Sequence, residues 1–174
     1  MTERIVFVNG IPALYNELKK VGREDEAKTL VRDFLNRTFL GDIDEKVERF
    51  LQVPTGIFLA DTPYFRIFWE FNQIYIAGLN YSTVVTAGVL CERVCLDILE
   101  KNRTKPKKKA CLGDLIKLIS KNNYAKPESI AEMKKIRKKR NEYVHAKMTA
   151  MDNKKDAFEM VQSISTILQN ELRV

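Results

Sequence analysis

The chain has 174 residues, of which 45% are hydrophobic and 30% charged, with a net charge of +7 and a single histidine. This balance predicts a folded globular protein, and seven glycines with five prolines are too few for a loop-rich all-β protein. Three cysteines cannot all pair, which argues against a secreted disulfide scaffold, and the apolar runs are too short or too interrupted for a signal sequence or a membrane span. We therefore expect a reduced, cytoplasmic protein that does not engage a membrane.

Residues 1–60 are predicted to form an N-terminal helical extension. Apolar residues recur at helical spacing in three segments of this part, 12–21, 24–40 and 44–51. In the third segment, Val47, Phe50 and Leu51 are expected to face inward. Ile5–Val8 is the one weak candidate for a strand.

Residues 61–174 are predicted to form an antiparallel helical bundle. Five segments have helical periodicity, at about 63–76, 80–102, 112–121, 127–148 and 152–172. The segment 80–102 carries two apolar lines, so we expect it to be buried on most of its circumference. The aromatic residues of 65–76 favour a packing core over a base-stacking platform. The predicted fold class is all-α.

Positive charge is concentrated in the second half of the chain. Residues 1–87 carry 10 basic and 12 acidic side chains, whereas residues 88–174 carry 20 and 11. Most of the excess lies in two runs, 101–109 and 134–140. Clustered Lys and Arg bind polyanions by displacing counterions from phosphates, which favours a nucleic-acid surface. A solvated loop and a solvated helix face explain the two runs equally well.

The segment RNEYVH, residues 140–145, holds the side chains best suited to chemistry. Arg140 lies on the apolar line of this helix, which is formed by Met133, Ile136, Tyr143 and Val144. Asn141 and His145 are four residues apart and therefore neighbours beside that line. An imidazole can move a proton and a guanidinium can neutralise charge on phosphate, so the three suit phosphodiester chemistry. Taken alone, the pattern more often reflects a surface or core histidine and an arginine held in a structural ion pair.

This segment resembles the Arg-x4–6-His motif of the HEPN superfamily, in the form with Asn directly after Arg. The flanking order is similar: a long apolar helix containing LCERVCL (90–96), a basic loop, a short helix containing LIKL (115–118), and then the motif helix. The resemblance spans roughly residues 60–172. It implies a HEPN-like bundle and a metal-independent endoribonuclease with no cofactor, in which two protomers pair and RNA is the substrate.

The resemblance also implies a role for each residue of the motif. His145 would act as general base or acid on the ribose 2′-OH, Arg140 would bind the scissile phosphate, and Asn141 would orient one or the other. The products would be a 2′,3′-cyclic phosphate and a 5′-OH. A toxin or antiviral effector of this kind would have a protein antitoxin or regulator as a partner. The alternative is a non-catalytic HEPN-like module that binds RNA, a nucleotide or a protein.

Two further residues are expected to support the motif. Glu92 lies on an apolar line of the helix 80–102, where an unpaired carboxylate is costly. We therefore expect Arg140 or Arg93 as its partner, in a pair that either positions Arg140 or merely closes a buried salt bridge. Tyr143 is a candidate for stacking on a base, although its inward position favours the core.

Lysines near the motif are candidates for tracking the RNA backbone. These are Lys107, Lys108 and Lys109 in the basic loop, and Lys138 and Lys139 on the motif helix. Cys91 and Cys95 are four residues apart with no second ligand pair, so they are predicted to be small buried hydrophobes. No metal site is expected.

Overall fold

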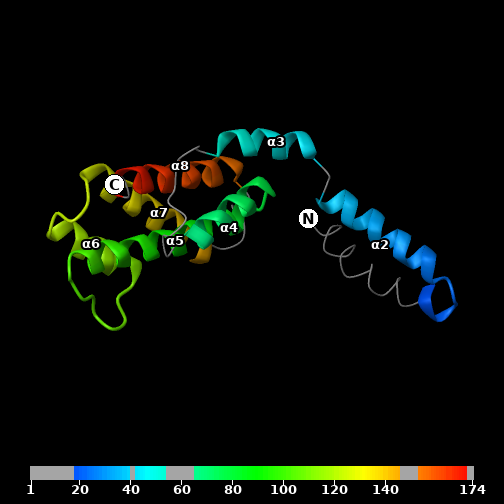
Figure 1. Ribbon diagram of the computed structural model, residues 1–174, viewed down its shortest axis with the longest axis horizontal. Coiled ribbons are helices and arrows are strands. Elements are labelled where there is room, and N and C mark those ends of the chain that lie inside the picture. Colours follow the sequence, from blue (N-terminus) through cyan, green and yellow to red (C-terminus); the bar gives the residue numbers. More distant parts are fainter. Residues whose placement is uncertain (1–17, 40–41, 54–64, 146–152, 172–174) are drawn as a thin grey trace. The chain divides into compact units, whose positions relative to one another are not determined.

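The computed structural model describes residues 18–39, 42–53, 65–145 and 153–171, which form helices joined by short connections (Figure 1). The predicted all-α fold is confirmed for these residues. The chain divides into two compact units, residues 1–45 and residues 46–174. The predicted boundary after residue 60, the strand candidate Ile5–Val8 and most of the predicted helix 12–21 fall outside the described residues.

The N-terminal part contains helix α2, Glu24–Phe39, followed by helix α3, Ile43–Gln52. Both agree with the predicted segments to within a residue or so. The first turn of α2 is acidic, with Glu24, Asp25 and Glu26. Carboxylates there interact favourably with the positive end of the helix dipole, which explains why the helix begins at this point.

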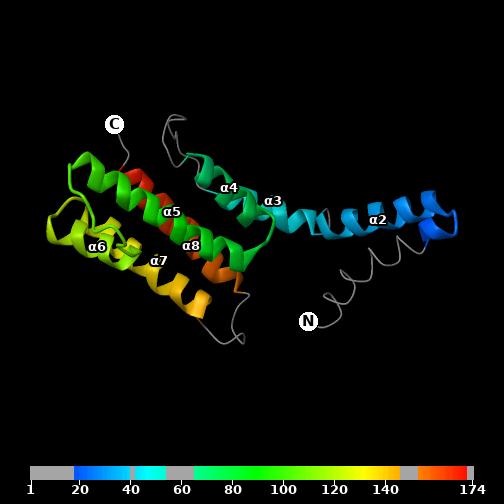
Figure 2. The same cartoon turned by 90° about the horizontal axis from the view of Figure 1, so that it is seen from below.

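The second unit holds most of α3 and five further helices: α4 (Phe65–Ile76), α5 (Asn80–Lys101), α6 (Leu112–Lys121), α7 (Pro127–His145) and α8 (Lys154–Glu171). Helix α5 contacts each of the other four, and Figure 2 shows it side by side with α7 and α8. The bounds agree with the predicted helices, except that the predicted continuation of α7 to Met148 lies outside the described residues.

One of the two apolar lines of α5 is fully buried, and the other is only partly covered. Val84, Ala87, Cys91, Val94, Cys95 and Ile98 all belong to the core. On the second line Leu99 is buried, Val85 and Leu96 are half-buried, and Val89 is 48% exposed. The expectation that α5 is buried on most of its circumference is therefore confirmed, because α4, α6, α7 and α8 all pack on it, and the exposed edge is limited to a few residues such as Val89.

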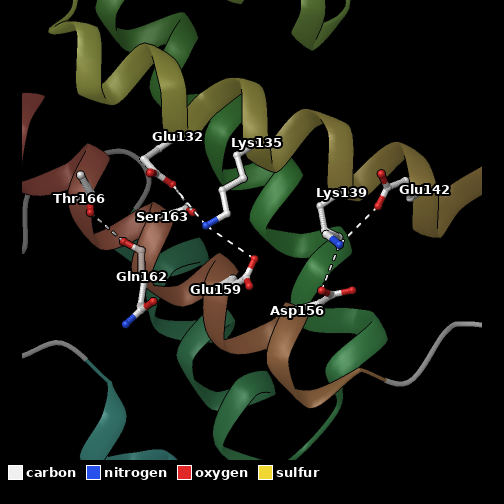
Figure 3. A network of polar contacts seen from close by, with 9 residues as sticks. All are labelled: Glu132, Lys135, Lys139, Glu142, Asp156, Glu159, Gln162, Ser163 and Thr166. Atoms are coloured by element: carbon white, nitrogen blue, oxygen red, sulfur yellow. Dashed lines mark hydrogen bonds and ion pairs between the residues drawn. The ribbon is translucent and has the colours of Figure 1, made fainter.

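The pairing of side chains shows that the long helices run antiparallel, as predicted. Between α7 and α8, Lys139 contacts Asp156 at 3.0 Å, and one turn earlier on α7 Lys135 contacts Glu159 at 3.6 Å (Figure 3). Along these contacts the residue numbers fall on α7 as they rise on α8, so the two helices run in opposite directions. Between α5 and α7, Cys95 Sγ lies 3.8 Å from Met133 Sδ. The side chains of the predicted apolar lines thus meet in a common core.

Helix α3 is packed with its polar side inward, which reverses the prediction. Val47, Phe50 and Leu51 are 50% to 70% exposed, whereas Arg49 is buried. Arg49 donates hydrogen bonds to the Tyr75 carbonyl (3.2 Å) and to Asn80 Oδ1 (2.9 Å), and its guanidinium lies over the Tyr75 ring. A guanidinium with these partners is satisfied in the interior, so the polar side of α3 can face the bundle.

The aromatic residues of α4 mostly belong to the core, as predicted. Phe68, Phe71 and Tyr75 are buried, and Phe71 and Tyr75 have no exposed surface. Trp69 and Phe65 are the exceptions, since both are exposed. Large aromatic side chains bury the most apolar area per residue, and three of them anchor α4 against α5 and α8.

Candidate functional site

The guanidinium of Arg140 lies against helix α5 at Gly88. A Cβ atom added to Gly88 would lie 2.6 Å from Arg140 Cδ, 2.8 Å from Cγ and 3.2 Å from Nε. The absence of a side chain at Gly88 therefore makes room for the arginine to cross α5. Arg140 is half-buried, and its Nε atom is buried without a hydrogen-bond partner. Such an atom is costly in a folded protein unless something binds to it.

No carboxylate neutralises Arg140 in the part of the chain that the structure describes. Among the described residues, Glu92 also forms no ion pair with Arg140, Arg93 or any other cation. The expected pairing of Glu92 is therefore wrong. The physical reason is that Glu92 is half-buried rather than buried, on the partly covered edge of α5, so water solvates its carboxylate.

Asn141 and His145 lie on the outer side of α7. Asn141 is half-buried, and His145, the last residue of the helix, is exposed. Arg140 and His145 are five positions apart, about 140° around an ideal helix. Arg140 therefore reaches toward α5 while His145 points away from the core. Within one chain, the described residues show no hydrogen bond that joins the three side chains.

The apolar side of α7 ends one residue earlier than expected. Met133, Ile136 and Tyr143 are buried, as predicted, but Val144 is 42% exposed. The prediction for Val144 is wrong because no neighbouring helix covers that side of the last turn. An exposed apolar residue thus lies next to His145 and one turn beyond Arg140.

Tyr143 belongs to the core and fixes the end of α7. Its hydroxyl donates a hydrogen bond to Asp156 Oδ2 at 3.0 Å, and its ring lies 6.0 Å from that of Tyr81, centroid to centroid. It is buried, with 4% of its surface exposed. These contacts hold the turn that carries Arg140 and His145, and they leave no free ring face for a base.

The candidate RNA-binding lysines differ in their surroundings. Lys107, Lys108, Lys109 and Lys138 are exposed and form no ion pair with any described residue. Lys139 lies between Asp156 at 3.0 Å and Glu142 at 3.4 Å. Burial alone would lower the pKa of Lys139, but its hydrogen bonds and its attraction to these carboxylates outweigh this and raise it. Lys139 therefore serves the packing of α7 on α8, whereas the other four remain available.

A residue that the sequence reasoning missed, Arg137, lies on the same side of α7 as Asn141 and His145. The three residues follow one another at a spacing of four, so they form one row along the helix. Arg137 is exposed and forms no ion pair with the described residues. A Cβ atom added to Gly113, on α6, would lie 2.6 Å from Arg137 Nε. The spacing of four was visible in the sequence and would have placed Arg137 in the site.

The three cysteines have separate environments. Cys91 and Cys95 are buried side by side, as predicted, and a hydrogen bond with Cys95 together with burial raises the pKa of Cys91 well above its usual range. Cys111 is exposed at the start of α6, where its thiol and backbone N–H both donate to Asp114 at 3.2 Å. Among the described residues, no three His, Cys, Asp or Glu side chains are grouped as metal ligands.

Comparison with protein-family models, with curated proteins and with solved structures found no match to this chain. In the described residues no helix is both long enough and apolar enough to cross a membrane. The geometry of α7 and its neighbours is therefore the basis for a functional interpretation.

Proposed function

We propose that the protein is a metal-independent endoribonuclease of HEPN type. The observation that carries the proposal is the Arg140 guanidinium, which lies against Gly88 with a buried, unpartnered Nε and without a carboxylate partner in the described residues. A half-buried cation of this kind suits an anionic ligand. The exposed imidazole of His145, on the next turn of the same helix, supplies a group that can accept and donate a proton.

In the proposed reaction, His145 accepts the proton of the ribose 2′-OH as the 2′ oxygen attacks the adjacent phosphorus. Arg140 stabilises the negative charge that builds up on the phosphate oxygens. The bond from phosphorus to the 5′ oxygen of the next nucleotide breaks, and that oxygen takes up a proton. A 2′,3′-cyclic phosphate and a 5′-OH result. The nucleophile belongs to the RNA, so DNA is not a substrate.

The active form is proposed to be a homodimer. Arg140 and His145 diverge by about 140° around one helix, so a composite site formed by two α7 helices would bring an arginine and a histidine together more easily. The two helices that meet at Arg140 carry exposed apolar side chains, Tyr81 and Val89 on α5 and Val144 on α7. Such residues are suited to an interface between identical copies. Val89→Lys should shift the mass measured by light scattering from dimer to monomer.

A cleavage assay in EDTA tests the reaction. His145→Ala should lower the rate by roughly 10²- to 10⁴-fold, the usual contribution of a general acid or base. Arg140→Ala should lower it by about 10²- to 10³-fold, as removal of a group that stabilises charge does. Arg66→Ala is the matched control, because Arg66 is exposed on α4, which carries no residue of the site. Wild-type rates in both site variants would contradict the proposal.

The alternative is a non-catalytic RNA-binding module, which the exposed lysines of the loop before α6 favour. RNA that is bound by the wild-type protein but never cut would support this alternative.

A further inference from the structure

Two arginines of α7 lie against two glycines of neighbouring helices in the same way. Arg140 crosses α5 at Gly88, and Arg137 crosses α6 at Gly113, where an added Cβ would lie 2.6 Å from Nε, 3.0 Å from Cζ and 3.1 Å from Nη2 of the arginine. Both glycines are buried within helices. Glycine is a poor helix former compared with alanine, so helix stability does not explain its use at either position.

The two arginines are also set apart from the lysines of the same helix. Lys135 and Lys139 face α8, where Glu159 and Asp156 pair with them (Figure 3). Arg137 and Arg140 lie on other sides of α7 and form no ion pair with the described residues. Helix α7 therefore has one neutralised basic side and one that keeps its charge.

Residues three apart on a helix are neighbours, so Arg137 and Arg140 start from adjacent positions on α7, although their side chains lie against different helices. Arg137 also begins the row that continues through Asn141 to His145. In the proposed homodimer, a single strand of RNA whose scissile phosphate lies at Arg140, with its ribose at the histidine of the other copy, can continue along α7 toward Arg137. Its next phosphate can then meet Arg137.

We propose that Arg137 binds a second phosphate of the RNA strand, and that Gly88 and Gly113 are positioning residues that seat Arg140 and Arg137. This inference rests on the proposed function for the identity of the ligand. It adds a binding residue outside the RNEYVH segment and gives a reason for two helical glycines. The substrate is then a single strand of RNA that the protein binds through at least two consecutive phosphates.

Binding of a short fluorescent RNA with 2′-O-methyl groups throughout tests the inference, because this RNA binds but cannot be cut. Arg137→Ala should weaken binding roughly tenfold at low salt, as loss of a charged hydrogen bond does. The slope of log affinity against log salt should become shallower by about 0.7, the value for one phosphate contact on a single strand. Arg66→Ala should change neither quantity.

The roles of the two glycines are tested by combining each glycine variant with the variant of its arginine. Gly113→Ala should weaken RNA binding in the wild-type background and have no further effect in the Arg137→Ala background. Gly88→Ala should behave in the same way with Arg140→Ala. Both alanine variants should keep or raise the melting temperature, because the arginine side chains can swing away and alanine favours the helix. If a glycine mattered only for packing, its replacement by alanine would instead lower the melting temperature.

The outcomes separate this inference from the proposed function. If Arg137→Ala binds RNA like the wild type, or if the wild type does not bind the RNA at all, the second phosphate site is refuted. If Gly113→Ala weakens binding equally in both backgrounds, Gly113 does not act through Arg137. If binding depends on Arg137 but the wild type cuts no RNA, the phosphate site stands and the nuclease proposal fails.

Discussion

Replacing Asp156 with alanine should loosen the end of α7 that carries the candidate site. Asp156 accepts a hydrogen bond from the Tyr143 hydroxyl and pairs with Lys139, both at 3.0 Å. Only 13% of the Asp156 side chain and 25% of the Lys139 side chain are exposed. The variant removes the acceptor of this Tyr143 hydrogen bond and the nearer of two carboxylates at Lys139, in a region that water reaches poorly.

Each hydrogen bond to a charged group contributes about 1.5–3 kcal/mol, and part of this is recovered because the buried carboxylate no longer has to be desolvated. We expect Asp156→Ala to lower the free energy of unfolding by about 2–3 kcal/mol. For a chain of this size that corresponds to roughly 5–10 °C in melting temperature. Urea unfolding followed by circular dichroism measures the change.

Glu142→Ala is the control, since Glu142 also pairs with Lys139 but is 46% exposed. An exposed ion pair contributes less than about 1 kcal/mol, so this variant should be nearly neutral. Because the pKa of Lys139 is raised, the stabilisation from its pairing is complete below the usual lysine pKa and is lost as pH rises through the raised value. Equal losses in the two variants, or a loss below about 0.5 kcal/mol in Asp156→Ala, would refute this account of the contact.

Three further predictions concern other parts of the structure. Arg49→Ala should lower the free energy of unfolding by about 2–4 kcal/mol in urea titrations, because it removes two buried hydrogen bonds from a charged donor to α4 and α5. Hydrogen bonds from the side chain and backbone of Cys111 lower the pKa of Asp114, so its contribution to stability is complete above the usual Asp pKa and is lost as pH falls through the lowered value. Asp114→Asn should therefore flatten the decline of stability toward acid in urea unfolding at a series of pH values, and an unchanged decline would contradict this. In the native protein a thiol reagent should label Cys111 rapidly and reach Cys91 and Cys95 only on unfolding; rapid labelling of all three would show that the core is open.

The helices could be predicted from the sequence because the residues that begin and end each helix lie next to it in the chain. Gly41 follows α2, Pro127 opens α7, and the apolar spacing of α5 and α8 is regular over many turns. The side of a helix that faces the core is harder to predict. The apolar side of α3 faces outward because buried Arg49 finds partners on α4 and α5, and those partners are distant in sequence.

The candidate site was predicted only in part for the same reason. The identities of Arg140, Asn141 and His145 follow from one short segment, but their surroundings depend on other helices. Spacing alone does not show that Arg140 lies in the space above Gly88. It also does not show that Lys139 pairs with Asp156 while Lys138, its neighbour in sequence, stays free of ion pairs with the described residues.

The central claim, that Arg140 and His145 act together on a ribose-phosphate linkage, is tested most directly by the ends of the cleaved RNA. We expect wild-type protein in EDTA to leave a 2′,3′-cyclic phosphate and a 5′-OH, identified by mass spectrometry, and a single 2′-deoxynucleotide at the cut site to prevent that cut. Cleavage of the 2′-deoxy substrate, or the same products at the same rate from His145→Ala, would contradict the claim.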